Sequence, residues 1–321
     1  MTPPLIPPSL DDIDAAQERI AGIALRTPLV PLMAAPGPPR ILIKLENLQP
    51  IGSFKLRGAA NAMTLAGPEA IARGVYTASA GNMAQGVAWC ARQFDVPCQV
   101  VVPESVPDVK LHAIERLGGK IVKVPFDQWW QTMLDHRYPG MDGLFVHPFA
   151  DAGVMAGNAT IGLEVLEDQP HVDTVLVPWG GGGLACGIAS AMRAASPGTR
   201  VYAVEVDTAA PLTASFAAGA AVTVTPTRSF IDGIGGKSVL AEMWPLARSL
   251  LAGVLTVSVA EVAKAVKLLA EQNHVIAEGA GAASVAAAMA GVPNPGTIAC
   301  IVSGGNIDAA KLATILGGGV P

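Results

Sequence analysis

Short apolar runs rich in β-branched residues alternate with helical segments along most of this 321-residue chain, and this alternation constrains the fold more than any other feature. A continuously apolar strand is buried on both faces, and strands separated by helices form parallel sheets covered on both faces. We therefore predict an α/β fold. The expected strands are Ile41–Leu45, Val75–Ala78, Gln99–Val102, Ile121–Val124, Leu144–Val146, Thr174–Val177, Val201–Val206, Val254–Val257 and Ile298–Val302.

Composition excludes several classes of protein. Charged residues make up 15% of the chain and the net charge is -5, without a block of Lys or Arg, so neither a nucleic-acid partner nor an anionic membrane is expected. No apolar run reaches the roughly 18–20 residues of a membrane span, and the N-terminus lacks a secretion signal. The expected location is cytoplasmic, because four cysteines in apolar surroundings without CxxC spacing predict buried free thiols: Cys90, Cys98, Cys186 and Cys300.

Three of the expected strands end in loops that contain glycine: Ser79–Asn82, Pro178–Gly183 and Ser303–Asn306. A strand that ends in Gly and enters a helix exposes backbone N–H groups at the positive end of the helix dipole, which suits an anion. Ligands of open α/β sheets bind outside the carboxyl ends of the strands. We therefore predict that the three loops converge on one site, where the consecutive glycines Gly180–Gly183 cradle a phosphate.

A dinucleotide site is the alternative for these glycines. Glu205 lies 22 residues beyond Gly183, where a nicotinamide-binding unit carries its ribose-binding acid. However, no three glycines within Gly180–Gly187 satisfy GxGxxG, and GxxxxGK[ST] is absent from the chain. The spacing therefore favours a single phosphate over a pyrophosphate.

Lys55 is the candidate nucleophile. It lies in the segment GSFKLRGA, where Ser53 is the expected N-cap of a helix and Lys55 falls in the first turn. The positive end of the helix dipole disfavours a cation there. A lowered pKa would favour the neutral amine that Schiff-base chemistry needs.

Four motifs together resemble the pyridoxal-phosphate enzymes of fold type II, and most closely their threonine/serine dehydratase and serine racemase branch. They are GSFKLRGA at Gly52–Ala59, SAGNMAQGVA at Ser79–Ala88, GGGGL at Gly180–Leu184 and SGGN at Ser303–Asn306. The resemblance implies the two-domain, tryptophan synthase β-like fold. Residues 1–69 and 151–321 would form a large cofactor-binding domain, and residues 70–150 a small mobile domain that binds the substrate carboxylate. It also implies a homodimer.

The resemblance assigns roles to individual residues. Lys55 would hold pyridoxal phosphate covalently, Phe54 would pack on its ring, Asn82 would bind its phenolic oxygen and Ser303 would face its pyridine nitrogen. The phosphate would be held by the N–H groups of Gly180, Gly181, Gly182, Gly183 and Leu184. The substrate carboxylate would dock on Ser79, Ala80, Gly81, Asn82 and Met83.

The implied reaction is elimination of water from a β-hydroxy amino acid, such as L-threonine or L-serine, to give a 2-keto acid and ammonia. Met83 stands where these dehydratases usually carry His, so either the pocket edge is less polar or Met83 packs behind the loop. The first case favours a bulkier substrate, of the phenylserine or hydroxyaspartate kind. Ala80 replaces the second Ser of serine racemases, so racemisation is not expected as the main reaction. A β-replacement enzyme and a non-catalytic cofactor-binding protein remain alternatives.

Three further features predict no site. Glu205 matches a carboxylate that supports a divalent cation in part of the family, but the second expected acid is Pro211. One carboxylate is too few for a hard cation, so no metal ligand is predicted and a divalent cation is left open. The five histidines lack HxH and HExxH spacing. The pair Trp129-Trp130 is interpreted as a core or surface feature rather than a substrate lid.

Overall fold

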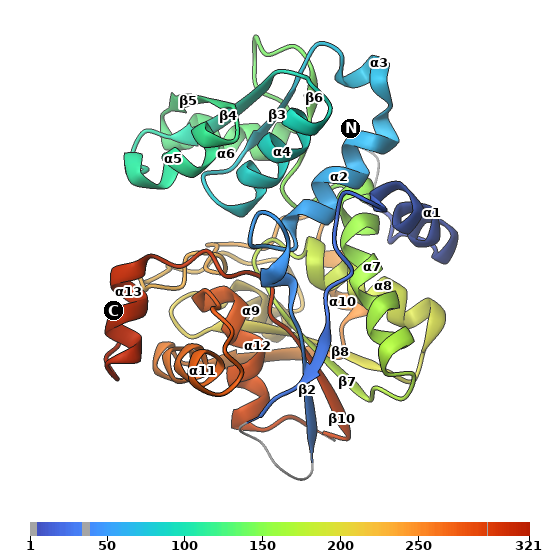
Figure 1. The fold of residues 1–321 in the computed structure, drawn as a ribbon, viewed down its shortest axis with the longest axis vertical. Coiled ribbons are helices and arrows are strands. Elements are labelled where there is room, and N and C mark those ends of the chain that lie inside the picture. Colours follow the sequence, from blue (N-terminus) through green and yellow to red (C-terminus); the bar gives the residue numbers. More distant parts are fainter. Residues whose placement is uncertain (1–4, 34–38, 294) are drawn as a thin grey trace.

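The computed structural model describes residues 5–33, 39–293 and 295–321, and within them the strands form two sheets (Figure 1). The remaining residues, which belong to the predicted large domain, lie outside the described part. One sheet has six strands in the order β1-β2-β10-β7-β8-β9, and the other has four in the order β5-β4-β3-β6. In Figure 1 the four-stranded sheet lies in the upper part of the molecule and the six-stranded sheet in the lower part. The α/β class predicted from the alternating runs is confirmed.

The predicted strands form within one or two residues of their expected bounds. Every neighbouring pair is parallel except β1 with β2. The unpredicted strand is β1, which has only three residues and ends on a proline. The six-stranded sheet consists of β1 Leu29–Pro31, β2 Arg40–Lys44, β7 Thr174–Pro178, β8 Arg200–Val206, β9 Gly253–Val257 and β10 Thr297–Ile301, and the four-stranded sheet of β3 Val75–Ala78, β4 Cys98–Pro103, β5 Gly119–Val124 and β6 Leu144–Phe145.

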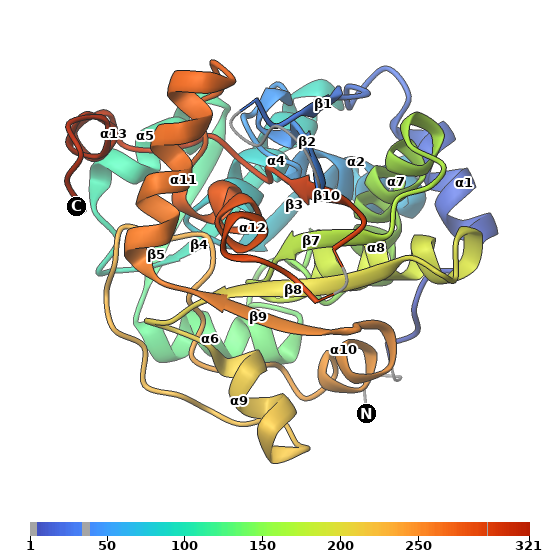
Figure 2. The ribbon, with the colours of Figure 1, turned by 90° about the horizontal axis from the view of Figure 1, so that it is seen from below.

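Two groups of helices bury the two faces of the six-stranded sheet. Apolar side chains of α11, α12 and α13 form one core with β2, β8 and β10, and those of α7, α8 and α10 form another with β7, β8 and β10. Seen from below, the two groups lie on different sides of the strands (Figure 2). The helices are α7 Ala152–Asp168, α8 Gly183–Ala195, α10 Trp244–Leu250, α11 Val259–Gln272, α12 Gly279–Ala290 and α13 Ala309–Leu316.

The four-stranded sheet has its own core, built from β3 and β4 with the helices that follow them and with the helix Lys55–Ala66, which precedes them in the chain. The other helices are α1 Leu10–Ile20, α2 Lys55–Ala66, α3 Pro68–Ile71, α4 Asn82–Gln93, α5 Asp108–Arg116, α6 Phe126–Asp135 and α9 Pro211–Ala218, with a short 3₁₀ turn at Glu46–Leu48. Helix α2 packs against α4 and α7, so it contacts both parts of the molecule.

A buried cluster of four charged side chains fastens α2 to the large sheet. The Arg57 guanidinium donates to both carboxylate oxygens of Glu46 and of Glu164, at 2.6–2.9 Å. The Lys44 ammonium also pairs with Glu164. None of the four exposes more than 4% of its surface. Two cations and two anions balance each other, which is the condition for burying charge without a large desolvation penalty.

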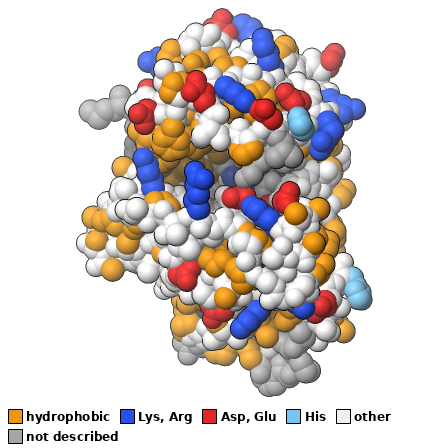
Figure 3. Space-filling view, turned by 90° about the vertical axis from the view of Figure 1, so that its left-hand side faces the viewer, with side chains coloured by type: hydrophobic (Ala, Val, Ile, Leu, Met, Phe, Trp, Pro, Cys, Tyr) orange, Lys and Arg blue, Asp and Glu red, His pale blue; other side chains and the backbone are white. Residues whose placement is uncertain are grey.

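The surface and the cysteines agree with the expectations from composition. All four cysteines are free and buried. None of the helices formed by the described residues is both long and apolar enough to span a bilayer. On the face drawn in Figure 3, acidic and basic side chains are interspersed, and the surface is hollowed between the upper and lower parts of the molecule.

Candidate active site

A cavity of about 540 Å³ lies between the two sheets, at the carboxyl ends of their strands. It brings together all the residues that the sequence assigned to cofactor or substrate. These are Phe54, Lys55, Ser79, Ala80, Gly81, Asn82, Met83, Gly180, Gly181, Gly182, Gly183, Leu184 and Ser303. The predicted convergence of the three glycine loops is therefore confirmed, whereas the role of each residue stays a prediction.

The Lys55 amine lies inside this cavity. Its Nζ donates to the carbonyl of Pro148 at 2.6 Å and lies 5.2 Å from the centre of the Phe54 ring. Burial lowers the pKa of Lys55 to about 8, although the Glu278 carboxylate partly opposes that shift. The direction agrees with the prediction, and its main cause is burial.

The predicted cap of this helix is wrong by one residue. Helix α2 begins at Lys55 with Phe54 as its N-cap, and Ser53 precedes it. Ser53 instead pairs with Gly304 of the loop after β10, which draws its backbone away from the cap position. Its hydroxyl still accepts a long hydrogen bond from the Lys55 N–H, at 3.4 Å.

The loop Ser79–Gly81 connects β3 to the first turn of α4, so it presents backbone N–H groups at a helix start. Asn82 is held on both sides, because its Nδ2 donates to Glu278 Oε1 and its Oδ1 accepts from Asn306 Nδ2, each at 2.8 Å. Met83 is 1% exposed and packs in the core of the four-stranded sheet, although it also borders the cavity. Both readings of Met83 are therefore partly right.

The four glycines are required by close packing as well as by backbone conformation. A Cβ on Gly181 would overlap the ring of Phe149, and one on Gly183 would lie 2.6 Å from the Phe149 carbonyl oxygen. Gly182 has a φ of +98°, which side chains rarely tolerate. Helix α8 begins at Gly183, so the N–H groups of its first turn have no partner within the helix. A bare backbone cradle at a helix start fits a phosphate.

Ser303 and Phe54 are joined through the backbone, since the Phe54 N–H donates to the Ser303 carbonyl at 3.0 Å. This bond brings the end of β10 next to the start of α2. Ser303 is 4% exposed and Phe54 is 9% exposed, so both form fixed walls of the cavity.

Several residues that line the cavity were missed as site residues. Glu278 contacts Asn82 and influences Lys55, but the sequence showed only that it begins the stretch EGAGAAS. Pro148 contributes through its carbonyl, for which no side-chain pattern exists. Trp129 and Trp130, interpreted as structural, both line the cavity.

Glu205 lies outside the cavity and caps a helix. Its two carboxylate oxygens accept the N–H groups of Leu212 and Thr213 at 2.8 and 2.7 Å, at the start of α9. The side chain is fully buried, and burial raises its pKa. The donors already bound to both oxygens explain why this acid is present without a second acid nearby.

His136, His147 and Glu242 lie close together, with their possible ligand atoms within 4.8 Å of one another, although the histidines lack the HxH or HExxH spacing of a metal site. His147 Nδ1 accepts the N–H groups of Phe149 and Ala150, so the ring proton lies on Nε2, which faces the Met133 carbonyl. Neither nitrogen keeps a lone pair for a metal ion. The cluster is therefore a hydrogen-bonded contact rather than a metal centre.

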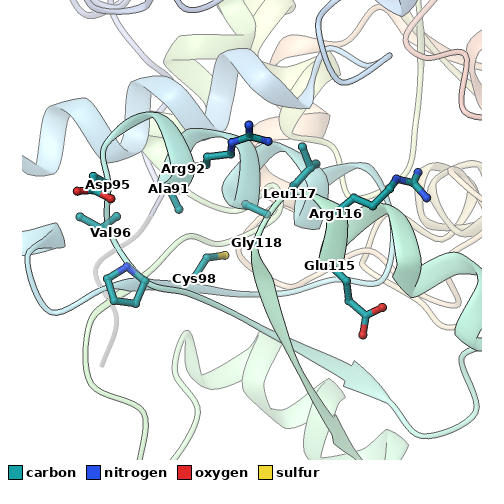
Figure 4. A pocket seen from close by; sticks show the side chains of 11 residues that line it. Ala91, Arg92, Asp95, Val96, Cys98, Glu115, Arg116, Leu117 and Gly118 are labelled. Atoms are coloured by element: carbon teal, nitrogen blue, oxygen red, sulfur yellow. The ribbon is translucent and has the colours of Figure 1, made fainter.

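A second cavity, of about 510 Å³, lies between α4, β4 and α5. Cys98 forms part of its floor, while the side chains of Glu115 and Arg116 point in different directions away from it (Figure 4). Among the described residues that line it, the charged side chains of Arg92, Asp95, Glu115 and Arg116 point in different directions, so the candidate site is the cavity that contains Lys55.

Comparison with known proteins agrees with this geometry. Residues 20–304 match the family model described as pyridoxal-phosphate dependent enzyme. The chain belongs to this family. It is 42% identical to an L-threonine ammonia-lyase of Geobacter sulfurreducens, over 86% of this chain and 69% of that protein, and 37% identical to one of Thermotoga maritima, over 97% and 79%. It also superposes on maize serine racemase with a TM-score of 0.86 and 30% identity, covering 96% of this chain and 97% of that one.

Membership of the family makes pyridoxal phosphate the cofactor of this enzyme. The fit is visible in the structure itself, because a buried amine of lowered pKa, a side-chain-free cradle and an aromatic ring share one cavity. The resemblance and fold predicted from the four motifs are confirmed.

Proposed function

We propose that this chain is an ammonia-lyase that removes water from a β-hydroxy amino acid and releases a 2-keto acid and ammonia. The single observation that carries the proposal is the position of the Lys55 amine, which shares one cavity with the α4 loop and the glycine cradle. Relatives named L-threonine ammonia-lyase support the same reaction.

The cofactor, when bound, supplies the electron-withdrawing group that makes the Cα proton of an amino acid removable. In our proposal Lys55 holds it, the N–H groups of Gly180–Leu184 bind its phosphate and Asn82 binds its phenolic oxygen. Phe54 packs on its ring. Ser303 would face its ring nitrogen. A hydroxyl there would not enforce protonation of the nitrogen as a carboxylate would, which would favour prompt loss of the β-hydroxyl.

The Lys55 amine is the proposed general base that removes the Cα proton of the substrate. A lysine whose pKa is about 8 is a better general base near neutral pH than one at the ordinary 10.5. The substrate carboxylate docks on the N–H groups of Ser79–Met83 at the start of α4, which turns the Cα proton toward the Lys55 amine. Ala80 carries only a methyl group, so that position offers no acid for a racemase to use on the opposite face.

Residues 70–150 are proposed to act as a small domain that closes over the substrate and excludes water. The four free, buried thiols support a reducing, cytoplasmic location. A homodimer is proposed from the family resemblance.

The deciding experiment replaces Lys55 and measures ammonia and 2-keto acid release from a panel of β-hydroxy amino acids. Lys55→Ala is expected to abolish release, and Lys267→Ala, which removes a lysine that pairs with Glu271 outside the cavity, is the matched control. Appreciable release by Lys55→Ala would contradict the role of the amine. A requirement for a thiol co-substrate would favour β-replacement, and a yellow protein without turnover on the whole panel would favour a binding protein.

A further inference from the structure

The cavity has an apolar wall that the proposed chemistry does not use. It is formed by side chains from α6, from the loop after β4 and from the segment before α10, namely Val106, Trp129, Trp130, Met133 and Leu240. The Lys55 amine and the two N–H-rich loops line the same cavity. A ligand held by those loops therefore has a hydrophobic surface facing it.

This wall adjoins the place where the substrate carboxylate is proposed to dock. Met133 shares a buried cluster with Ala78, the residue immediately before the Ser79–Met83 loop, and Trp129 packs against that cluster. Phe149, next to the carbonyl that holds Lys55, packs against it as well. A substrate bound by its carboxylate, with Cα at Lys55, thus has its β-substituent within reach of α6.

Contacts with the large domain hold α6 in this position. Trp130 packs against the core of the six-stranded sheet, and the Lys237 ammonium lies 5.0 Å from the centre of its ring. His136, which follows α6, is 2.9 Å from Glu242. The wall is therefore held in place from the side of the large domain as well as from its own sheet.

The charges around the cavity favour one class of bulky substituent over another. Among the described residues that line it, Lys55 is the single cationic side chain, and Asp232 and Glu278 are acidic. The Lys237 ammonium lies beside the Trp130 ring but is not among the residues that line the cavity. A second carboxylate on the substrate would therefore meet no lining cation other than Lys55 and would lose hydration. An aromatic ring would instead replace water on an apolar wall, which is favourable.

We propose that Trp129 and Met133 form the recess for the substrate side chain, and that the enzyme prefers β-hydroxy amino acids with a large apolar, especially aryl, group at Cβ. The inference rests on the proposed function and specifies its substrate class. With 3-phenylserine the reaction expels the β-hydroxyl as water, and hydrolysis then returns one water. The net products are phenylpyruvate and ammonia, with no oxidant or reductant required.

The first test compares kcat/KM of the holoenzyme for L-threonine, 3-hydroxyaspartate and both diastereomers of 3-phenylserine. One diastereomer of 3-phenylserine is expected to exceed threonine by at least about tenfold, since burial of a phenyl ring contributes more than the 1.4 kcal/mol that tenfold requires. A kcat/KM for threonine or hydroxyaspartate equal to or above that of phenylserine would overturn the inference and leave the proposed function intact.

Calorimetric binding to the holoenzyme tests the recess even where no substrate turns over. 3-Phenylpropanoate is expected to bind at least about tenfold more tightly than succinate. Equal or reversed affinities would overturn the inference. Absence of ammonia release from every amino acid, with this preference retained, would refute only the proposed reaction.

The third test replaces an apolar side chain of the wall by a charged one. Trp129→Arg is expected to lower the ratio of kcat/KM for phenylserine to that for hydroxyaspartate by at least about tenfold, because it replaces an apolar surface by a counter-charge. Trp129→Phe should largely keep the ratio. Trp244→Arg, at a tryptophan that packs on Phe216 outside the cavity, is the matched control. A ratio that moves equally in Trp129→Arg and the control would refute the assignment.

Discussion

Replacing Arg57 with Met should destabilise the protein strongly, although Arg57 contacts no ligand. The guanidinium satisfies two buried carboxylates and also donates to the Leu25 carbonyl and the Thr160 hydroxyl. Without it, Glu46 and Glu164 share the single cation Lys44, which leaves one uncompensated negative charge in the core. Loss of one partner of a buried pair costs about 3–5 kcal/mol.

The loss should be visible as a fall in melting temperature. An unfolding entropy of about 2.1 cal/mol/K per residue gives about 0.7 kcal/mol/K for 321 residues. The expected fall is therefore about 4–7 °C at pH 8. The double variant Glu46→Gln/Arg57→Met removes one charge of each sign and should recover much of that fall, because Lys44 and Glu164 still balance each other.

The loss of stability in Arg57→Met should be smaller at acidic pH than at pH 8. Burial alone would raise the pKa of Glu46, but Arg57 and its other partners keep it below the ordinary 4.5. In the wild type this carboxylate stabilises the fold above pH 4.5, and its contribution is lost as pH falls through the lowered pKa. In Arg57→Met the pKa of Glu46 should instead rise, so protonation relieves the defect on acidification. A deficit equal at pH 8 and pH 5, or a double variant no more stable than the single one, would refute the reasoning.

Three further outcomes follow from the cavity. The pKa of about 8 predicts that covalent uptake of pyridoxal phosphate by the apoenzyme rises about tenfold per pH unit below pH 8 and levels off above it; a midpoint near 10.5 would contradict the burial of Lys55. Glu278→Gln removes the charge that raises this pKa, so the midpoint of the same uptake profile should move to lower pH. Gly181→Ala should weaken cofactor affinity roughly tenfold by displacing Phe149, whereas Gly198→Ala, which meets open space, should change nothing measurable in a fluorescence titration.

The strands and the converging loops were predictable because they depend on local sequence. A strand buried on both faces must be continuously apolar, and a loop that presents bare backbone must be rich in Gly, so each leaves its own pattern. β1 could not be predicted in this way, because it has only three residues and ends in Pro31, which is too short a segment to show a hydrophobic pattern. The cap at Ser53 was misplaced because its pairing with Gly304 is a contact across 251 residues, and no propensity of the local segment includes that contact.

The contacts that tune the site are also non-local. Glu278 influences Lys55 from 223 positions away, and Pro148 binds the amine through a carbonyl that every residue possesses. Trp129 and Trp130 illustrate the remaining difficulty. The sequence shows that both are hydrophobic. Whether they border the core or the cavity depends on how α6 is turned, and its contacts with the core of the six-stranded sheet decide that.

The turn from His147 to Ala150 connects the Lys55 amine to the glycine cradle Gly180–Gly183. Pro148 accepts from Lys55, and Phe149 fills the space that the absent side chain of Gly181 leaves. His147 fixes the turn by accepting the N–H groups of Phe149 and Ala150, and this requires an unprotonated Nδ1. Burial, with the neighbouring His136, lowers the pKa of His147 to about 3. Its Nδ1 therefore stays a hydrogen-bond acceptor at neutral and mildly acidic pH. A histidine that titrated normally would release the turn under mild acid, and both the amine and the cradle would lose their support together.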